Sequence, residues 1–259
     1  MKNLFKLEWR KVFKSKILYI FLVLVAVLPL LNELIVYFSY DIAKEEYHIS
    51  LKEFIEAAKL SGVNSMLGAI SASDISLCMA LFVSIYICTD YSDGTLRNVI
   101  GRGYKRFDVF TVKYIISMAV TLGYVIVAQL FSFIYGSAFW GAGTFKAKML
   151  LMLFVQTVNI LALTSFYILF SVLVKKMGGA ICSCLFIPVG ITLVLSICDL
   201  FTKENAKVIP SYFWAGNVFS NLTDFYTPNI TIIVMLVSGF VSLALFTGLS
   251  ILCTRNTEY

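Results

Sequence analysis

The chain has 259 residues, of which 59% are hydrophobic and only 14% are charged, and its formal net charge is +6. A soluble domain carries roughly a quarter charged residues, so this composition leaves too little polar surface to cover a water-soluble globule. Nucleic-acid binding is excluded as well, because it needs a basic face on a soluble domain, and the basic residues here flank apolar segments instead.

Residues 1–16 predict an amphipathic helix that lies in the membrane interface. Phe5, Trp9, Val12 and Phe13 share one helical stripe, and four cations lie largely opposite: Lys2, Lys6, Arg10 and Lys14. Such a helix places its aromatic face at the acyl boundary and its cations at lipid phosphates. The same residues fit a second interpretation, in which the helix is a collar packed around the bundle.

Six apolar segments are long enough to cross a bilayer core of ~30 Å as helices. They cover residues of about 17–38, 65–88, 114–140, 149–174, 180–198 and 230–253. The uninterrupted apolar part of the second segment begins only at Ile75, so we expect its helix to extend back to about Ser65. That extension brings Asp74 into the membrane. The sequence therefore predicts one all-α integral membrane domain over residues 1–259.

The distribution of Lys and Arg predicts the orientation, because cytoplasmic loops carry an excess of both. With both termini in the cytoplasm, fourteen of the 21 basic residues lie on the cytoplasmic side. We therefore expect a multi-pass protein of the cytoplasmic membrane with both termini inside.

The loop between the second and third spans is the most informative stretch. We expect the Asp93 carboxylate to cap a short helix that begins near Gly94. Leu96, Val99 and Ile100 then share one side of this helix, and an exposed apolar side invites a protein partner. The alternative is an ordinary charged loop.

This loop resembles the first cytoplasmic loop of the type-2 ABC transporter permease family. The resemblance rests on Asp90, on the run Gly94, Thr95, Leu96, Arg97 and Asn98, and on Arg106 and Lys113. That family usually has Glu where Asp90 stands. The order of elements along the whole chain is also similar, from an elbow helix through six spans.

The resemblance implies a coupling helix at 93–100 that docks on a cytoplasmic ATPase. Asp90, Arg97 and Arg106 would hold the shape of the loop. It also implies a dimer of two permeases with two ATPase subunits. A re-entrant segment is implied before the last span, and residues 199–228 fit it, with Tyr212, Phe213, Trp214 and Phe219 as expected interfacial anchors.

Polar residues inside the spans are the candidates for a translocation pathway. Ionisable groups in a membrane are costly enough to be functional hypotheses by default, which singles out Glu33 and Asp74. Both lie in the outer half of the membrane, where simple exposure to water is the alternative. Gln129, Gln156 and Asn159 lie deeper, where hydrogen bonds between helices are the more usual role.

The sequence lacks the signatures of catalysis. It has no phosphate-binding loop of the form Gly-x-x-x-x-Gly-Lys-Ser/Thr, so ATP and Mg are expected on a partner ATPase. Its only histidine, His48, lies in a loop, which excludes His-containing zinc motifs. We expect no catalytic residue, no metal site and no cofactor in this chain.

The function favoured by the sequence is therefore that of a permease subunit in an ATP-driven exporter of hydrophobic or amphipathic cargo. Peptides such as toxins or antimicrobial peptides are the expected cargo, and a lipid or drug is the runner-up. The alternative class is a membrane sensor or immunity protein that does not transport. The expected partners are ABC ATPase subunits, a second permease copy, membrane lipid and the cargo, and no nucleic acid.

Overall fold

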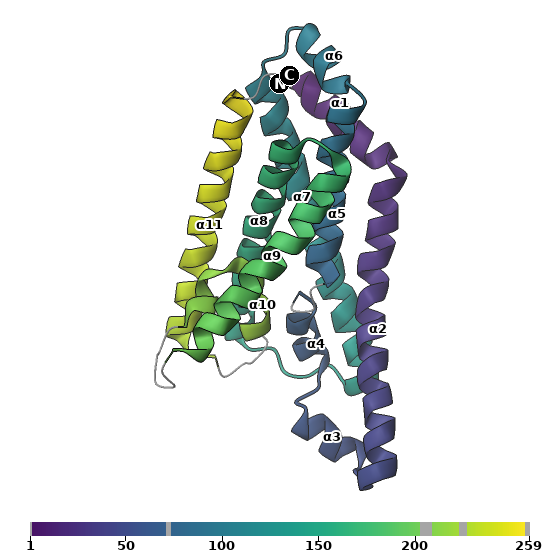
Figure 1. Cartoon of the computed structure of the whole chain (residues 1–259). Helices are drawn as coiled ribbons and strands as arrows, with labels where there is room; N and C mark the ends of the chain where they lie inside the picture. Colours follow the sequence, from purple (N-terminus) through teal and green to yellow (C-terminus); the bar gives the residue numbers. More distant parts are fainter. Residues whose placement is uncertain (1, 71–73, 203–208, 223–226, 257–259) are drawn as a thin grey trace.

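A computed structural model describes residues 2–70, 74–202, 209–222 and 227–256 of the chain, and every regular element among them is helical (Figure 1). The helices that precede the third span are α1 (Lys2–Lys14), α2 (Lys16–Tyr47), α3 (Leu51–Ala57), α4 (Gly62–Gly68), α5 (Asp74–Ser92) and α6 (Thr95–Gly101). The remainder are α7 (Arg106–Trp140), α8 (Ala147–Val174), α9 (Met177–Leu200), the short 3-10 helix η1 (Pro210–Phe213), α10 (Ala215–Asn221) and α11 (Asn229–Asn256).

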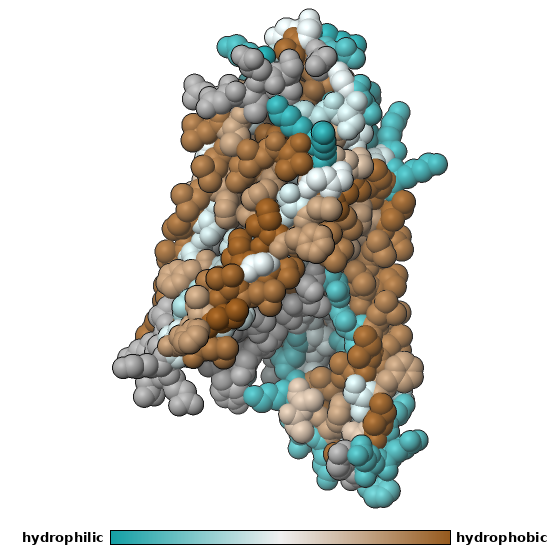
Figure 2. Space-filling view, viewed as in Figure 1, coloured by the Kyte–Doolittle hydropathy of each residue, from teal (hydrophilic) through white to brown (hydrophobic). Residues whose placement is uncertain are grey.

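Six of the described helices, α2, α5, α7, α8, α9 and α11, are long and apolar enough to cross a membrane. The surface carries a broad apolar belt, with most polar groups gathered at its two ends (Figure 2). Exposed Leu, Ile, Val and Phe side chains on α2, α9 and α11 supply much of this belt. The expectation of an all-α protein with six candidate spans is therefore confirmed.

The core of the bundle is formed by α5, α7 and α8, whose apolar segments are the most buried. Helix α8 contacts α5, α7, α9 and α11, and its longest contact is with α11. Helices α1 and α6 lie at one end of the bundle, where α1 begins and α11 ends, whereas α3 lies at the other end (Figure 1).

The structure differs from the predicted boundaries most clearly at the second span. The single helix expected over 65–88 is divided into α4, which ends at Gly68, and α5, which begins at Asp74. Helix α4 packs on α7 instead of continuing into α5. The backbones approach closely there, because a Cβ added to Gly136 would lie 2.4 Å from the Ser65 hydroxyl and 3.0 Å from the Cα of Gly62. Small residues therefore make α4 a separate element.

The N-terminal helix packs one of its faces against the bundle. Leu4, Glu8 and Val12, each one helical turn apart, are buried against the bundle. The rings of Phe5, Trp9 and Phe13 form a neighbouring row, with centroids 5.7 and 5.0 Å apart. Phe5 and Phe13 remain exposed. Helix α1 thus packs on the bundle, and its position in the membrane interface stays a prediction.

Two of the four expected interfacial anchors before the last span are buried inside the bundle. Trp214 and Phe219 belong to the hydrophobic core, and the Trp214 ring lies 5.6 Å from Phe166 in an edge-on contact. Only Phe213 is largely exposed. The anchor assignment was therefore wrong for Trp214 and Phe219, whose rings join η1 and α10 to the core.

Candidate functional site

The turn from α5 into α6 is made by a glycine, and no aspartate caps the new helix. Gly94 is the N-terminal cap residue and has a φ of 65°, in the left-handed region that favours glycine. The start of α6 has no side-chain cap, so the predicted capping role of Asp93 was wrong. Asp93 lies exposed beyond the end of α5.

Thr95, the first residue of α6, is tied back to α5. Its hydroxyl donates a hydrogen bond of 2.8 Å to the Asp90 carboxylate. This hydrogen bond connects the two sides of the tight turn at Gly94. The position of α6 is therefore fixed by the preceding helix, and the sequence placed both partners in the correct loop.

Asp90 also pairs with two lysines from other helices. Its two carboxylate oxygens accept hydrogen bonds from Lys11 of α1 and Lys113 of α7, one each. Asp90 is only 2% exposed and Lys113 only 5% exposed. A buried charge is costly unless it is paired and hydrogen-bonded, and both of these charges meet that condition.

A second carboxylate completes the cluster. Glu8 of α1 is buried, its carboxylate accepts a 3.0 Å hydrogen bond from the Tyr86 hydroxyl, and it lies 3.6 Å from the Lys113 ammonium. The same ammonium lies 4.7 Å from the centre of the Tyr86 ring, within the range of a cation–π contact. We call this set of Glu8, Lys11, Tyr86, Asp90, Thr95 and Lys113 the α6-end network.

The α6-end network joins four helices, α1, α5, α6 and α7, through two carboxylates and two ammonium groups whose formal charges cancel. Removing one partner of a buried ion pair leaves an uncompensated charge and costs about 3–5 kcal/mol. The hydrogen bonds and ion pairs of the network therefore oppose independent movement of the four helices.

The apolar side of α6 faces the bundle, contrary to the expectation that it is exposed. Leu96 is only 8% exposed, and Val99 packs against the core. The exposed positions on α6 are polar or lack a side chain, and they include Asn98 and Gly101. A partner that approaches α6 would meet these positions and the exposed Arg102 that follows them. Ile100 is half-buried.

Two further residues of the predicted coupling loop, Arg97 and Arg106, were expected to hold its shape. Arg106 is the first residue of α7 and is exposed. The side chain of Arg97 falls outside the described part of the structure. Their predicted role in shaping the loop stays a prediction.

Two of the three neutral polar residues of the predicted pathway, Gln156 and Asn159, form hydrogen bonds between helices. The Gln156 amide donates a 2.9 Å hydrogen bond to the Leu67 carbonyl, which joins α8 to α4. The Asn159 amide donates to the Met235 carbonyl of α11 at 3.2 Å. Gln129 of α7 is 9% exposed, and its amide nitrogen has no hydrogen-bond partner among the described residues.

Glu33 and Asp74 lie at the opposite end of the bundle from α6. Glu33 is only 8% exposed, and its carboxylate accepts a 2.6 Å hydrogen bond from the Trp140 indole. Asp74 is half-buried at the start of α5, and the Asn32 amide approaches it at 3.5 Å. Glu33 is therefore not a simply exposed surface residue, whereas Asp74 is partly exposed.

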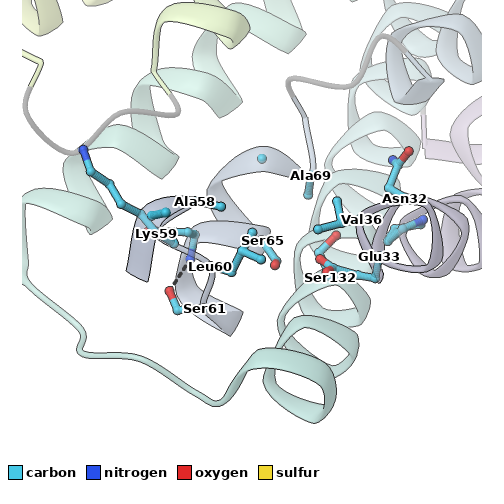
Figure 3. A pocket seen from close by; sticks show the side chains of 14 residues that line it. Asn32, Glu33, Val36, Ala58, Lys59, Leu60, Ser61, Ser65, Ala69 and Ser132 are labelled. Carbon is cyan, nitrogen blue, oxygen red and sulfur yellow. Dashed lines mark hydrogen bonds between the residues drawn. The ribbon is translucent and has the colours of Figure 1, made fainter. Parts of the chain in front are cut away.

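Glu33 and Asn32 line a cavity of about 550 Å³ between α2, α4, α7 and the chain that joins α3 to α4. We call it the α3-end cavity; Figure 3 shows Glu33, Asn32 and Val36 on one side of it and the 58–61 segment on the other. Its polar lining includes Ser132 of α7. A cavity of this volume is in the range of small-molecule sites.

The sequence reading missed three members of the α6-end network: Glu8, Lys11 and Tyr86. A signal for Glu8 existed, because it lies in helical register with Leu4 and Val12, on the stripe that is buried. The aromatic row beside this stripe has the stronger hydrophobic pattern, although Phe5 and Phe13 in it are exposed. Nothing in the sequence connects Tyr86 to Glu8, since their hydrogen bond spans 78 positions of the chain.

The described residues contain no group of three or more His, Cys, Asp or Glu side chains placed to hold a metal ion. Residues 4–199, about three quarters of the chain, match a family described as ABC-2 family transporter protein. No curated protein and no solved structure matches the chain significantly.

Proposed function

The chain belongs to the ABC-2 family of transporter proteins, and on that premise we propose that it is the permease of an ATP-driven exporter. Membership makes it a multi-pass membrane protein and the membrane subunit of an ABC transporter. We further propose the direction of transport, the class of cargo, the orientation of the chain in the membrane and the way in which the ATPase is coupled to it. ATP and Mg would be bound by the partner ATPase.

The orientation we propose places the α6 end in the cytoplasm. Fourteen of the 21 basic residues lie in the segments assigned to that side, and a positive bias of short loops marks the cytoplasmic face. Helix α1 begins and α11 ends at the α6 end (Figure 1). Both termini would then be cytoplasmic.

The observation that carries the proposal is the α6-end network. We propose that an ATPase docks against the exposed side of α6 and that the network transmits its movement into α1, α5 and α7. A short helix at the end of a bundle transmits little if it is loosely attached. Here Thr95 and Asp90 tie α6 to a buried cluster of charges.

The proposed cargo is hydrophobic or amphipathic, with peptides such as toxins or antimicrobial peptides as the favoured class. The described spans carry few charges away from the two ends, and this suits amphipathic cargo better than sugars or ions. We further propose that two copies assemble, or one copy with a related permease, and that η1 and α10 form a re-entrant segment before α11.

The test is purification of the tagged chain in mild detergent, with mass spectrometry of the proteins retained. We expect a stoichiometric ATPase that carries a phosphate-binding loop. Arg102→Glu reverses the charge of an exposed side chain next to α6, and this variant should retain less ATPase. Lys52→Glu, the same change of charge on the exposed surface of α3, is the matched control and should retain the ATPase.

A chain that purifies alone and stimulates no ATP hydrolysis would contradict the exporter proposal and favour the sensor or immunity class. Equal retention by Arg102→Glu and the wild type would contradict the docking surface but not the ATPase partner. Leu96→Asp is not a suitable docking variant, because Leu96 is buried and its replacement would disturb α6 itself.

A further inference from the structure

The α3-end cavity contains an acid whose hydrogen bonds leave one oxygen available. Glu33 lines the cavity, and the Trp140 indole occupies only one of its two carboxylate oxygens. No described residue donates to the other oxygen. A carboxylate can accept several hydrogen bonds, so a donor that enters the cavity would find an acceptor already held in position.

One wall of the cavity is held in place by hydrogen bonds, and the lining carries groups of two kinds. Gly62 and Val63 of α4 donate hydrogen bonds of 2.8 and 3.2 Å to the Gly141 and Ala142 carbonyls, which fixes α4 on the end of α7. Hydroxyls of the lining come from Ser61, Ser65 and Ser132, and apolar lining comes from Pro29, Val36, Ala57, Ala58, Leu60 and Ala69. The cavity therefore suits an amphipathic ligand.

The charge of the lining indicates the sign of that ligand. Glu33 is at one side, and behind Asn32 a second carboxylate, Asp74, lies within 3.5 Å of its amide. Lys59 lines the opposite side and its side chain extends away from Glu33 (Figure 3). A ligand that brings an ammonium to the Glu33 side would match this arrangement.

The depth of Glu33 indicates where such a ligand comes from. Glu33 lies about 26 Å along α2 from its first residue, Lys16, at a rise of ~1.5 Å per residue. A bilayer core is ~30 Å thick. With the orientation proposed above, Glu33 is close to the level of the outer head groups. Neighbouring α2 residues Leu31, Ile35 and Phe38 are exposed, as expected of a surface in contact with lipid.

We propose that the α3-end cavity binds the head group of an outer-leaflet aminophospholipid, with Glu33 accepting a hydrogen bond from its primary ammonium. Phosphatidylethanolamine has this chemistry, with its phosphate next to the ammonium. A peptide is the less favoured occupant, because the described walls consist of helices and the 58–61 segment and offer no strand edge for a backbone. A metal ion is also disfavoured, since Glu33 is the one carboxylate in the lining.

The inference rests on the proposed orientation but not on the ATPase or on transport. Its test therefore uses the permease alone in nanodiscs and needs no motor. The chain has three tryptophans, and replacing Trp9 and Trp214 by Phe leaves Trp140, the partner of Glu33, as the single fluorescent reporter. The host lipid is phosphatidylcholine, whose quaternary ammonium has no N–H to donate.

Replacing phosphatidylcholine stepwise by phosphatidylethanolamine should shift the Trp140 emission until the site is saturated. Glu33→Gln keeps an oxygen for the Trp140 indole but removes the charge. It should raise the half-saturating lipid fraction about tenfold, the effect of losing a hydrogen bond to a charged group. Ala58→Phe, at an exposed position on the cavity wall, should abolish the shift, whereas Leu51→Phe on α3 outside the cavity should preserve it.

An unchanged emission at every lipid fraction would overturn the proposal, as would an equal shift in the Glu33→Gln variant. A shift with the anionic lipid phosphatidylglycerol in place of phosphatidylethanolamine would also contradict it. If a lysine-rich amphipathic peptide produced a Glu33-dependent shift in pure phosphatidylcholine and phosphatidylethanolamine produced none, the cavity would instead bind cargo. Each of these outcomes leaves the ATPase test above unaffected.

Discussion

The two ends of the bundle differ in how many partners a buried carboxylate has. At the α6 end, Asp90 is enclosed by Lys11, Lys113 and Thr95, so each carboxylate oxygen has a partner. At the α3 end, Glu33 has one partner, Trp140, and faces a cavity. A fully satisfied polar network makes a structure rigid, whereas a carboxylate oxygen with no partner can still accept a hydrogen bond. This difference is the reason why we propose mechanical coupling at the first end and ligand binding at the second.

The largest effect is expected from Asp90→Ala. This change leaves Lys113 buried at the junction of α1, α5 and α7 without its main counter-ion, and it should destabilise the protein by about 3–5 kcal/mol. The matched control is Asp93→Ala, because Asp93 is exposed and its side chain does not cap α6. This change should alter the free energy of unfolding by less than about 0.5 kcal/mol. The measurement is the unfolding equilibrium in mixed detergent micelles, followed by circular dichroism. Equal effects of the two variants would contradict the α6-end network as a stabilising unit.

A smaller loss is expected from Gly94→Ala, which tests the turn that presents α6. Gly94 has a φ of 65°, and no atom lies within 4 Å of where a Cβ would stand, so the cost is conformational alone. It should amount to about 1–2 kcal/mol. Gly101→Ala is the control, since Gly101 is helical and has equally open space. That change should be neutral or stabilising by up to about 1 kcal/mol, and a loss in Gly101→Ala as large as in Gly94→Ala would contradict the turn geometry.

The comparison also explains which features the sequence could predict. The six apolar spans followed from hydrophobicity alone, and Asp90, Thr95 and Lys113 were placed in the correct loop because they are close in the chain. Glu8 and Tyr86 were missed, because a contact between residues 78 positions apart has no local pattern. The break between α4 and α5 was missed for a related reason: Gly62, Gly136 and Ser65 promote close packing that hydrophobicity does not register.

The direction in which side chains point was predicted less well than their membership of an element. Leu96 was expected to face a partner and is buried, and Trp214 was expected at the membrane interface and lies in the core. In both cases an apolar side chain stands next to polar residues, so the local sequence allows it to face either the core or the outside of the bundle. The fold decides between the two, because the local sequence fits either of them.

A modest effect is expected from Glu33→Gln, and it sharpens the contrast with Asp90. The glutamine keeps an acceptor for the Trp140 indole, and the charge it removes has no cationic partner among the described residues. The free energy of unfolding should therefore change by less than about 1 kcal/mol, measured as for Asp90→Ala. A loss as large as that of Asp90→Ala would mean that Glu33 is structural, and the two ends would no longer differ in kind.

The smallest effect concerns pH at the α3 end. Ser50 begins α3 and forms a reciprocal capping box with Glu53. The Ser50 backbone amide donates to the Glu53 carboxylate, and the Ser50 hydroxyl accepts from the Glu53 backbone amide; hydrogen bonding to Ser50 lowers the pKa of Glu53 below its usual 4.5. A lowered pKa means that the capping stabilises α3 above pH about 4.5 and that this contribution is lost as the pH falls through the lowered value.

Acidification should therefore loosen α3, whose last residue Ala57 forms part of the cavity wall. Hydrogen exchange at the α3 amides should become faster between pH 5 and about pH 3, relative to the intrinsic exchange rate at each pH. Glu53→Gln is the control, because its side chain does not titrate, and its exchange ratio should stay flat over the same range. A wild-type ratio that is equally flat would show that the capping box does not hold α3, and the wall of the α3-end cavity would then depend on α4 and its packing against α7 alone.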